Sequence, residues 1–151
     1  DMGRRLERAI HGCRLIALFA GDQASDDDLT VLLDLMDSQI SYRTRYLTGP
    51  ALAPVRDLLA LEPVNPRALA WQAQRLADHV AALPTLRADG LPEEPRRIAG
   101  ALAAQLAPLT GDMLTMADIA AAETRLLALS DAIGQRYFLQ LRKTQSADIL
   151  A

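Results

Sequence analysis

Two charged segments of the sequence carry side chains that could bind an anion or form a buried ion pair. Glu7 and Arg8 are adjacent near the start of the chain, and Arg43 lies within the segment QISYRTRY, residues 39–46. An arginine offers planar N–H donors that match a carboxylate or a phosphate, and a glutamate held near them can act as a general base. These residues therefore predict either a polar binding site or a structural ion pair between helices.

Arg43 occupies an unusual position on the helix that its segment predicts. If residues 25–47 form one continuous helix with 100° per residue, Gln39 and Arg43 project from the middle of a broad apolar arc, whereas Arg45 faces solvent. A guanidinium keeps its charge, so an arginine directed at a core must extend to the helix edge or meet a carboxylate. Both interpretations of Arg43 remain open from the residues alone.

The first predicted helix, residues 2–20, supplies the expected partner. Glu7 lies on its charged side, opposite the apolar stripe, but Leu15 and Leu18 fall in the same sector one or two turns later. Because another segment should cover those leucines, we expect Glu7 to be partly enclosed and to pair with Arg43, with a tyrosine hydroxyl nearby. The predicted polar cluster comprises Arg4, Glu7, Arg8, Gln39, Tyr42, Arg43 and Tyr46.

The single tryptophan marks a second candidate surface. On the predicted helix 66–83, Trp71 lies across the axis from the apolar stripe, beside Arg67 and Arg75. A ring in that position could stack on Arg75 one turn later, or cover an interface with another segment or subunit. We expect an intramolecular or subunit contact at Trp71 rather than a bound ligand.

The remaining reactive side chains form no recognisable metal or nucleophile pattern. His11 and Cys13 are two residues apart on a helix and so point to different faces, and His79 is far from both in the sequence. Ser130 and Asp131 lack a neighbouring histidine, which argues against a catalytic triad. The sequence thus predicts no metal ion and no cofactor, and it leaves open whether the chain is an enzyme.

Helix start and stop signals define the elements that must position these side chains. Ser25 precedes three aspartates, Asn65 precedes a proline, and Thr115 precedes Asp118 in a variant of the capping box; each pattern is typical of a helix start. No alternating strand pattern is visible. The predicted fold class is all-α, a bundle-like array of about six helices in a single domain, 1–151. The predicted helices are residues 2–20, 25–47, 52–61, 66–83, 95–109 and 115–143, with an exposed loop over 85–94.

Composition and charge narrow the function classes. Half of the 151 residues are hydrophobic but only 4% are aromatic, a balance typical of helices. A net charge of -3 and a pI near 5.3 argue against a nucleic-acid or anionic-membrane surface. The longest uncharged apolar run, residues 98–111, is too short to span a bilayer. With one cysteine and no visible secretory signal, we expect a cytoplasmic location.

Three motifs occur in order along the chain: GRRLERA at 3–9, DSQISYRTRYL at 37–47 and NPRALAWQ at 65–72. Together with residues 129–131 and 136–138, this set resembles the alpha-E family, a bacterial helical domain of unknown function with a Glu-Arg motif. Position 71 is Trp where the family pattern leads us to expect Phe. The resemblance implies that the chain is the C-terminal part of a longer alpha-E domain or fusion protein. Carried over residue by residue, the family motif falls on Glu7, Arg8, Arg43 and Arg45.

The resemblance implies a functional context more than a reaction. Alpha-E domains occur beside, or fused to, circularly permuted ATP-grasp proteins and transglutaminase-like proteins, in a setting of peptide or amide ligation. We therefore expect an accessory or scaffolding module with such a partner, in cis or in trans, and a homo-oligomer is a second candidate assembly. The alternative is a substrate- or anion-binding enzyme subunit that uses the Glu/Arg site.

Overall fold

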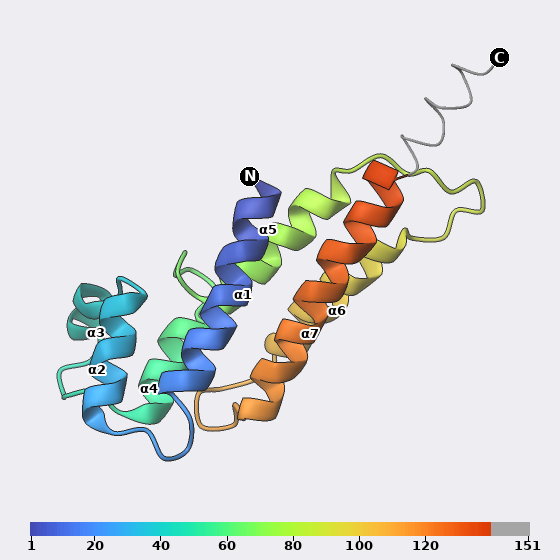
Figure 1. The fold of residues 1–151 in the computed structure, drawn as a ribbon. Helices are drawn as coiled ribbons and strands as arrows, with labels where there is room; N and C mark the ends of the chain where they lie inside the picture. The colour runs from blue at the N-terminus through green and yellow to red at the C-terminus, as the bar shows by residue number, and fades with distance from the viewer. Residues whose placement is uncertain (140–151) are drawn as a thin grey trace.

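The computed structural model describes residues 1–139, and these residues fold into helices joined by loops (Figure 1). Two π-helical segments, η1 (Asp57–Leu61) and η2 (Gly134–Leu139), directly continue the fourth and seventh α-helices. No strand occurs within 1–139, so the predicted all-α class is confirmed, with seven α-helices in place of about six. The helices are α1 (Met2–Phe19), α2 (Asp26–Leu35), α3 (Gln39–Arg45), α4 (Leu52–Arg56), α5 (Leu69–Ala81), α6 (Glu94–Leu106) and α7 (Met116–Ile133).

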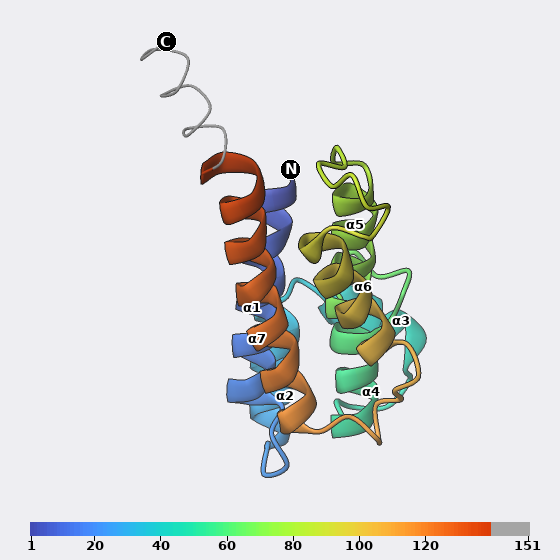
Figure 2. The same cartoon turned by 90° about the vertical axis from the view of Figure 1, so that its right-hand side faces the viewer.

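The four longest helices form the body of the molecule. α1 packs against α7 and α5, and α6 packs against α5 and α7, so that the four helices surround one core. Figures 1 and 2 show α1 and α7 running side by side, with α2, α3 and α4 gathered toward one end of the bundle. Each long helix thereby buries its apolar stripe against its neighbours.

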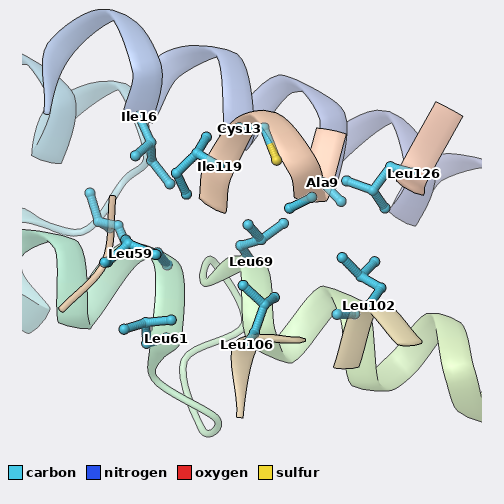
Figure 3. Close-up of a cluster of buried hydrophobic side chains, with 14 of the residues drawn as sticks. Ala9, Cys13, Ile16, Leu59, Leu61, Leu69, Leu102, Leu106, Ile119 and Leu126 are labelled. Carbon is cyan, nitrogen blue, oxygen red and sulfur yellow. The ribbon is translucent and has the colours of Figure 1, made fainter. Parts of the chain in front are cut away.

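Aliphatic side chains fill the core between these helices. Cys13 and Ile16 of α1, Leu69 of α5 and Leu102 of α6 are buried and belong to one cluster, and they line the space between α1 and the helices opposite it (Figure 3). Leu59 of η1 belongs to the same cluster. The shorter helices are therefore attached to the four-helix body through a shared apolar core, and α1 is held in a fixed orientation.

Two helices begin at capping boxes. Ser25 Oγ accepts a hydrogen bond from Asp28 N at 3.1 Å, while the Asp28 carboxylate accepts one from Ser25 N at 2.9 Å. Thr115 and Asp118 exchange the same pair of bonds at the start of α7, at 3.2 Å and 2.8 Å. The predicted cap at Ser25 and the predicted box at Thr115 are both confirmed, and the shorter aspartate replaces the usual glutamate in each.

The helix predicted over residues 25–47 is wrong, because the chain interrupts it at 36–38. Asp37 has a φ of 50°, in the left-handed region that aspartate enters more easily than most residues. Ser38 is buried, and its N–H donates to Leu33 O at 2.8 Å, which closes a tight turn between α2 and α3. A helical wheel drawn across both helices therefore does not describe the orientation of the residues after the break.

Of the next two predicted helices, the first is confirmed and the second begins later than predicted. The segment predicted over 52–61 is helical throughout, as α4 followed by η1, with Pro54 in the first turn. α5 begins at Leu69, three residues later than predicted. Asn65 forms a turn in place of an immediate helix start, because its side-chain Oδ1 accepts from Arg67 N at 3.1 Å.

The last two helices differ from the prediction mainly at their ends. α6 spans 94–106, against a predicted 95–109. α7 ends at Ile133, and η2 continues the helical path to Leu139. The predicted extension over 140–143 lies outside the described residues.

Arg56 is a buried arginine that links three segments of the chain. It is 5% exposed, and its guanidinium donates to Ala20 O and to Leu114 O, each at 2.9 Å. It also pairs with Asp22 at 3.0 Å. Ala20 follows α1 and Leu114 lies just before α7, so one side chain fixes the approach to both helices. A buried guanidinium is stable only when its donors are satisfied, as they are here by two carbonyls and a carboxylate.

Candidate functional site

α1 directs the Glu-Arg dipeptide away from the core. The apolar stripe expected to face the core is mostly buried, but two of its members differ: Ile10 is half-buried and Ala17 is exposed. Its buried members are Leu6, Ala9, Cys13, Ile16 and Ala20. The two leucines that we expected another segment to cover differ from each other: Leu15 is half-buried, whereas Leu18 is 75% exposed. The exposed polar residues of this face are Arg4, Glu7, Arg8, His11 and Arg14.

Glu7 and Arg8 take no part in holding the described structure together. Both side chains are exposed, and neither forms an ion pair or a side-chain hydrogen bond with any residue of 1–139. Arg56 differs from them, because its guanidinium forms hydrogen bonds and an ion pair with other parts of the chain. The Glu-Arg dipeptide is therefore available to a ligand or to another protein.

Arg8 lies between two hollows on this face. The first, which we name the Arg8–Gln72 hollow, has a volume of about 140 Å³ and is bounded by α1, the turn after α2 and the start of α5. Its apolar wall consists of Gly12, Leu15, Leu35, Met36 and Pro66. Its polar wall consists of Arg8, His11, Asp37, Arg67 and Gln72.

The polar wall of the Arg8–Gln72 hollow contains a mixture of paired and unpaired groups. Arg67 and Asp37 form an ion pair at 2.7 Å. Gln72 is 4% exposed, and its Nε2 donates to Pro66 O at 2.8 Å. Gln72 Oε1 is the one buried side-chain nitrogen or oxygen within the described residues that lacks a hydrogen-bond partner. Buried polar atoms are rarely left in this state, so this atom calls for an explanation.

The second hollow is an open trough between α1 and α7. It is lined by Glu7 and Arg8, together with His11, Arg14 and Leu127. Arg14 Nε contacts Glu123 Oε1 of α7 at 2.7 Å, which bridges the two helices beside the trough. Its apolar lining consists of Ile10 and Leu127, and Leu127 is 44% exposed. The trough places the Glu-Arg dipeptide on an accessible surface shared by α1 and α7.

The expected Glu7–Arg43 ion pair is absent from residues 1–139. Arg43 is exposed and lines a separate hollow beside α3, whereas Glu7 lines the trough on α1. Arg45, expected to face solvent without a partner, pairs with Glu62, which is 9% exposed. That hydrogen bond raises the pKa of Arg45. The two arginines thus have the opposite roles to those predicted, because the break at 36–38 rotates α3.

The other members of the predicted cluster stabilise α3 and the loop that follows it. Tyr42 is 2% exposed, and its hydroxyl donates to Gly49 O at 3.2 Å and accepts from Ala51 N at 3.1 Å. The Tyr46 ring lies against it with centroids 4.8 Å apart, and burial raises the pKa of Tyr46. Gln39 Nε2 donates to Thr30 O at 2.9 Å. These residues lie with Arg43 around its own hollow, and Glu7 and Arg8 line others.

Trp71 makes the stacking contact predicted for it and one more. The guanidinium carbon of Arg75 lies 5.8 Å from the ring centroid, and that of Arg5 on α1 lies 4.9 Å from it. The half-buried ring therefore joins α5 to α1 by cation–π contacts. Arg67 does not join this group, because it turns toward Asp37 at the Arg8–Gln72 hollow.

Glu93 is a buried carboxylate in the loop that we predicted to be exposed. It is 5% exposed, and one of its oxygens accepts from Leu86 N at 2.7 Å and Arg87 N at 2.9 Å. Arg136 Nε donates to the other oxygen at 2.7 Å. The hydrogen bond from Arg136 lowers the pKa of Glu93. No pattern in the sequence indicated this pair, because its members are 43 residues apart.

Residues 1–139 contain neither a group of side chains that could hold a metal ion nor a membrane-spanning helix. No group of three or more His, Cys, Asp or Glu side chains in that range could hold a metal ion. Cys13 is buried in the core, and burial raises the pKa of its thiol to about 12. None of the described helices is long and apolar enough to cross a membrane.

Comparison with known proteins gives one result. The family model of Alpha-E, described as a predicted alpha-helical domain with a conserved ER motif, matches residues 1–138. No curated protein and no solved structure matches the chain. Glu7-Arg8 is the one Glu-Arg dipeptide in the 151 residues, and it lies on the exposed face of α1.

Proposed function

The chain belongs to the Alpha-E family of helical domains, and from this premise we propose that it is an accessory binding module of a peptide or amide ligation system. Its partner in this proposal is a circularly permuted ATP-grasp protein or a transglutaminase-like protein, joined in cis or in trans. The chain itself would be the C-terminal part of a longer domain. Because such a system consumes ATP, the proposal implies a cytoplasmic location.

The exposed, unpaired state of Glu7 and Arg8 is the observation that supports this proposal most. A motif that served folding would be expected to satisfy its charges within the chain, as Arg56 does. Glu7 and Arg8 instead lie on an accessible trough between α1 and α7. Charged side chains placed in this way favour recognition of a partner of complementary charge.

Neither histidine contacts a side chain within 1–139 that it could activate as a nucleophile. His11 is on α1 and His79 is on α5, and neither hydrogen-bonds to a serine, threonine or cysteine within 1–139. His79 accepts a hydrogen bond from Arg5 at 3.2 Å. A nucleophile activated by a histidine needs that contact or a close approach to it. The proposal therefore assigns the covalent step to the partner.

A binding experiment with charge-reversed variants tests the module function. The chain would be purified together with a candidate circularly permuted ATP-grasp protein, and complex formation would be measured by size-exclusion chromatography and calorimetry. We expect Glu7→Lys combined with Arg8→Glu to weaken the complex at least about tenfold, while Arg4→Glu, an exposed residue that lines neither hollow, leaves it unchanged. A complex that forms equally well with the charge-reversed chain would contradict the proposal.

A second candidate function is binding of an anionic substrate. The specific observation in its favour is that Arg8, which has no ion-pair partner within 1–139, also lines the Arg8–Gln72 hollow. In this alternative the chain is the substrate-binding subunit of an enzyme and Arg8 receives the negative charge. Retention of small carboxylates by the isolated chain would support it, and failure of all such anions to bind would exclude it.

A further inference from the structure

The hollow beside α3, which we name the Arg43 hollow, has the size of a small-molecule site. Its volume is about 380 Å³, and ligand pockets in proteins span roughly 300–1,000 Å³. Its lining residues fall within 30–33 of α2, 39–46 at α3 and 47–50 of the loop that leads to α4. The hollow thus lies at the end of the bundle where the short helices gather (Figure 1).

Hydrogen bonds between its walls hold the Arg43 hollow in shape. Gln39 Nε2 of α3 donates to Thr30 O of α2 at 2.9 Å. The Tyr42 hydroxyl joins α3 to the loop, because it donates to Gly49 O at 3.2 Å and accepts from Ala51 N at 3.1 Å. A ligand therefore meets walls that are already in place, which reduces the ordering that binding must bring about.

Arg43 gives the hollow a single positive charge. It is exposed, it forms no ion pair or side-chain hydrogen bond within 1–139, and it is the one charged residue among the described residues that line the hollow. Arg45, two residues later, is compensated by Glu62. A carboxylate matches one guanidinium in both charge and geometry, because it accepts two parallel hydrogen bonds.

Apolar surface lies open beside this charge. Leu47 lines the hollow and is 98% exposed, so its side chain gains almost no burial from the described chain. The half-buried residues Tyr46 and Pro50 line the same hollow. A single exposed leucine is common on protein surfaces, so it is the position of Leu47 beside an unpaired guanidinium that favours a ligand with both an anionic and an apolar part.

We propose that the Arg43 hollow binds a monocarboxylate with an apolar body, such as a short aliphatic acid. Arg43 binds the carboxylate, and Leu47, Tyr46 and Pro50 contact the carbon chain. A cavity of about 150 Å³ holds the six carbons of benzene, so the hollow has room for roughly fifteen non-hydrogen atoms. Neither residue of the Glu-Arg dipeptide lines this hollow, and the proposal does not depend on the function proposed for that dipeptide.

Four probes separate the charge from the apolar body in NMR titrations of the full chain in phosphate-free buffer. Hexanoate carries both, propionate has a shorter apolar chain, hexanamide lacks the charge, and inorganic phosphate lacks the apolar body. We expect hexanoate to bind at least about fivefold more tightly than propionate, because its extra methylenes leave water. Hexanamide should bind about fivefold more weakly than hexanoate, as expected for an exposed ion pair, and phosphate at equal concentration should not displace hexanoate.

Matched variants connect the two requirements to their residues. Arg43→Gln should weaken hexanoate binding about fivefold, whereas Arg4→Gln, an exposed arginine outside the hollow, should not. Arg43→Glu should bind hexylamine in preference to hexanoate, because the charge of the hollow is reversed. Leu47→Ser should remove the preference for hexanoate over propionate without unfolding the chain, since Leu47 is almost fully exposed; Val64→Ser, at a valine 77% exposed outside the hollow, is its control.

The outcomes separate this site from the Arg8–Gln72 hollow. Hexanoate that shifts the amide signals of residues 39–50, and does so less in Arg43→Gln, would support the proposal. Failure of hexanoate to bind, equal binding of hexanoate and hexanamide, or displacement by phosphate would overturn it. Binding that is lost in Arg8→Gln and kept in Arg43→Gln would place the carboxylate in the Arg8–Gln72 hollow, which would overturn this proposal and support the second candidate function.

Discussion

Replacement of Arg45 by Met should destabilise the fold, whereas the same replacement at Arg43 should not. Both arginines lie on α3, two residues apart, and both are exposed to solvent on at least one side. Arg45 pairs with Glu62, whose side chain is 10% exposed, while Arg43 has no ion-pair partner within 1–139. Removing Arg45 leaves a carboxylate that is mostly buried and has lost its charged donor.

The size of the effect follows from the exposure of the two partners. A hydrogen bond to a charged group contributes about 1.5–3 kcal/mol. The Arg45 side chain is 47% exposed, so solvent screens its half of the interaction and the lower end of that range applies. We expect Arg45→Met to cost about 1.5 kcal/mol, which lowers Tm by roughly 3–6 °C in a protein of this length.

Thermal and urea unfolding of the parent and the two variants measure this difference. Arg43→Met should stay within about 0.5 kcal/mol of the parent, as surface substitutions usually do. Adding Glu62→Met to Arg45→Met should recover part of the loss, because the unpaired carboxylate is then gone. Equal stability of Arg45→Met and the parent, or an equal loss in Arg43→Met, would refute the assignment of roles to the two arginines.

Four further predictions address other parts of the fold. Arg56→Met should lower the free energy of unfolding by about 2–6 kcal/mol, because two buried carbonyls each lose a donor at about 1–3 kcal/mol; urea unfolding against Arg97→Met, an exposed arginine, provides the comparison. Gly111→Ala should cost about 1–3 kcal/mol, since its β carbon would collide with the carbonyl of Ala53, and a Tm equal to the parent's would contradict that contact. Glu93 has a pKa below its usual 4.5, so its stabilising contribution is present above that pH and is lost as the pH falls; the stability gap between Glu93→Gln and the parent should shrink on acidification, and a gap independent of pH would count against the pairing. Cys13, with a pKa of about 12, should react with a thiol reagent only after unfolding, and rapid labelling of the native chain would show that the core is open there.

Most of the correct predictions about the fold came from helix caps and from the spacing of apolar residues. Ser25 and Thr115 begin helices because a side-chain oxygen three residues from a carboxylate satisfies local amides. Spacing alone also identified Leu6, Cys13 and Ile16 as buried residues of α1, although Ala17 and Leu18 near its end are exposed. Both features depend on residues close together in the sequence, which is why the sequence was sufficient for them.

The errors arose where a tertiary contact or a single dihedral angle decided the outcome. One positive φ at Asp37 ended α2, and a wheel that ignored it exchanged the roles of Arg43 and Arg45. Glu62 lies beyond the helix that carries Arg45, and Arg56 finds its carbonyl partners 36 and 58 residues away. The spacing of apolar residues along the sequence gives no information about contacts between distant residues, so these buried charges could be identified only from the structure.

The free energy of unfolding of a Glu7→Gln/Arg8→Gln double variant tests most directly whether the Glu-Arg motif is reserved for binding. Both side chains are exposed and unpaired within 1–139, so urea unfolding should give a value within about 0.5 kcal/mol of the parent. A loss of more than about 2 kcal/mol would show that the motif supports the fold through interactions the exposed positions do not suggest, and would contradict its assignment to a binding surface.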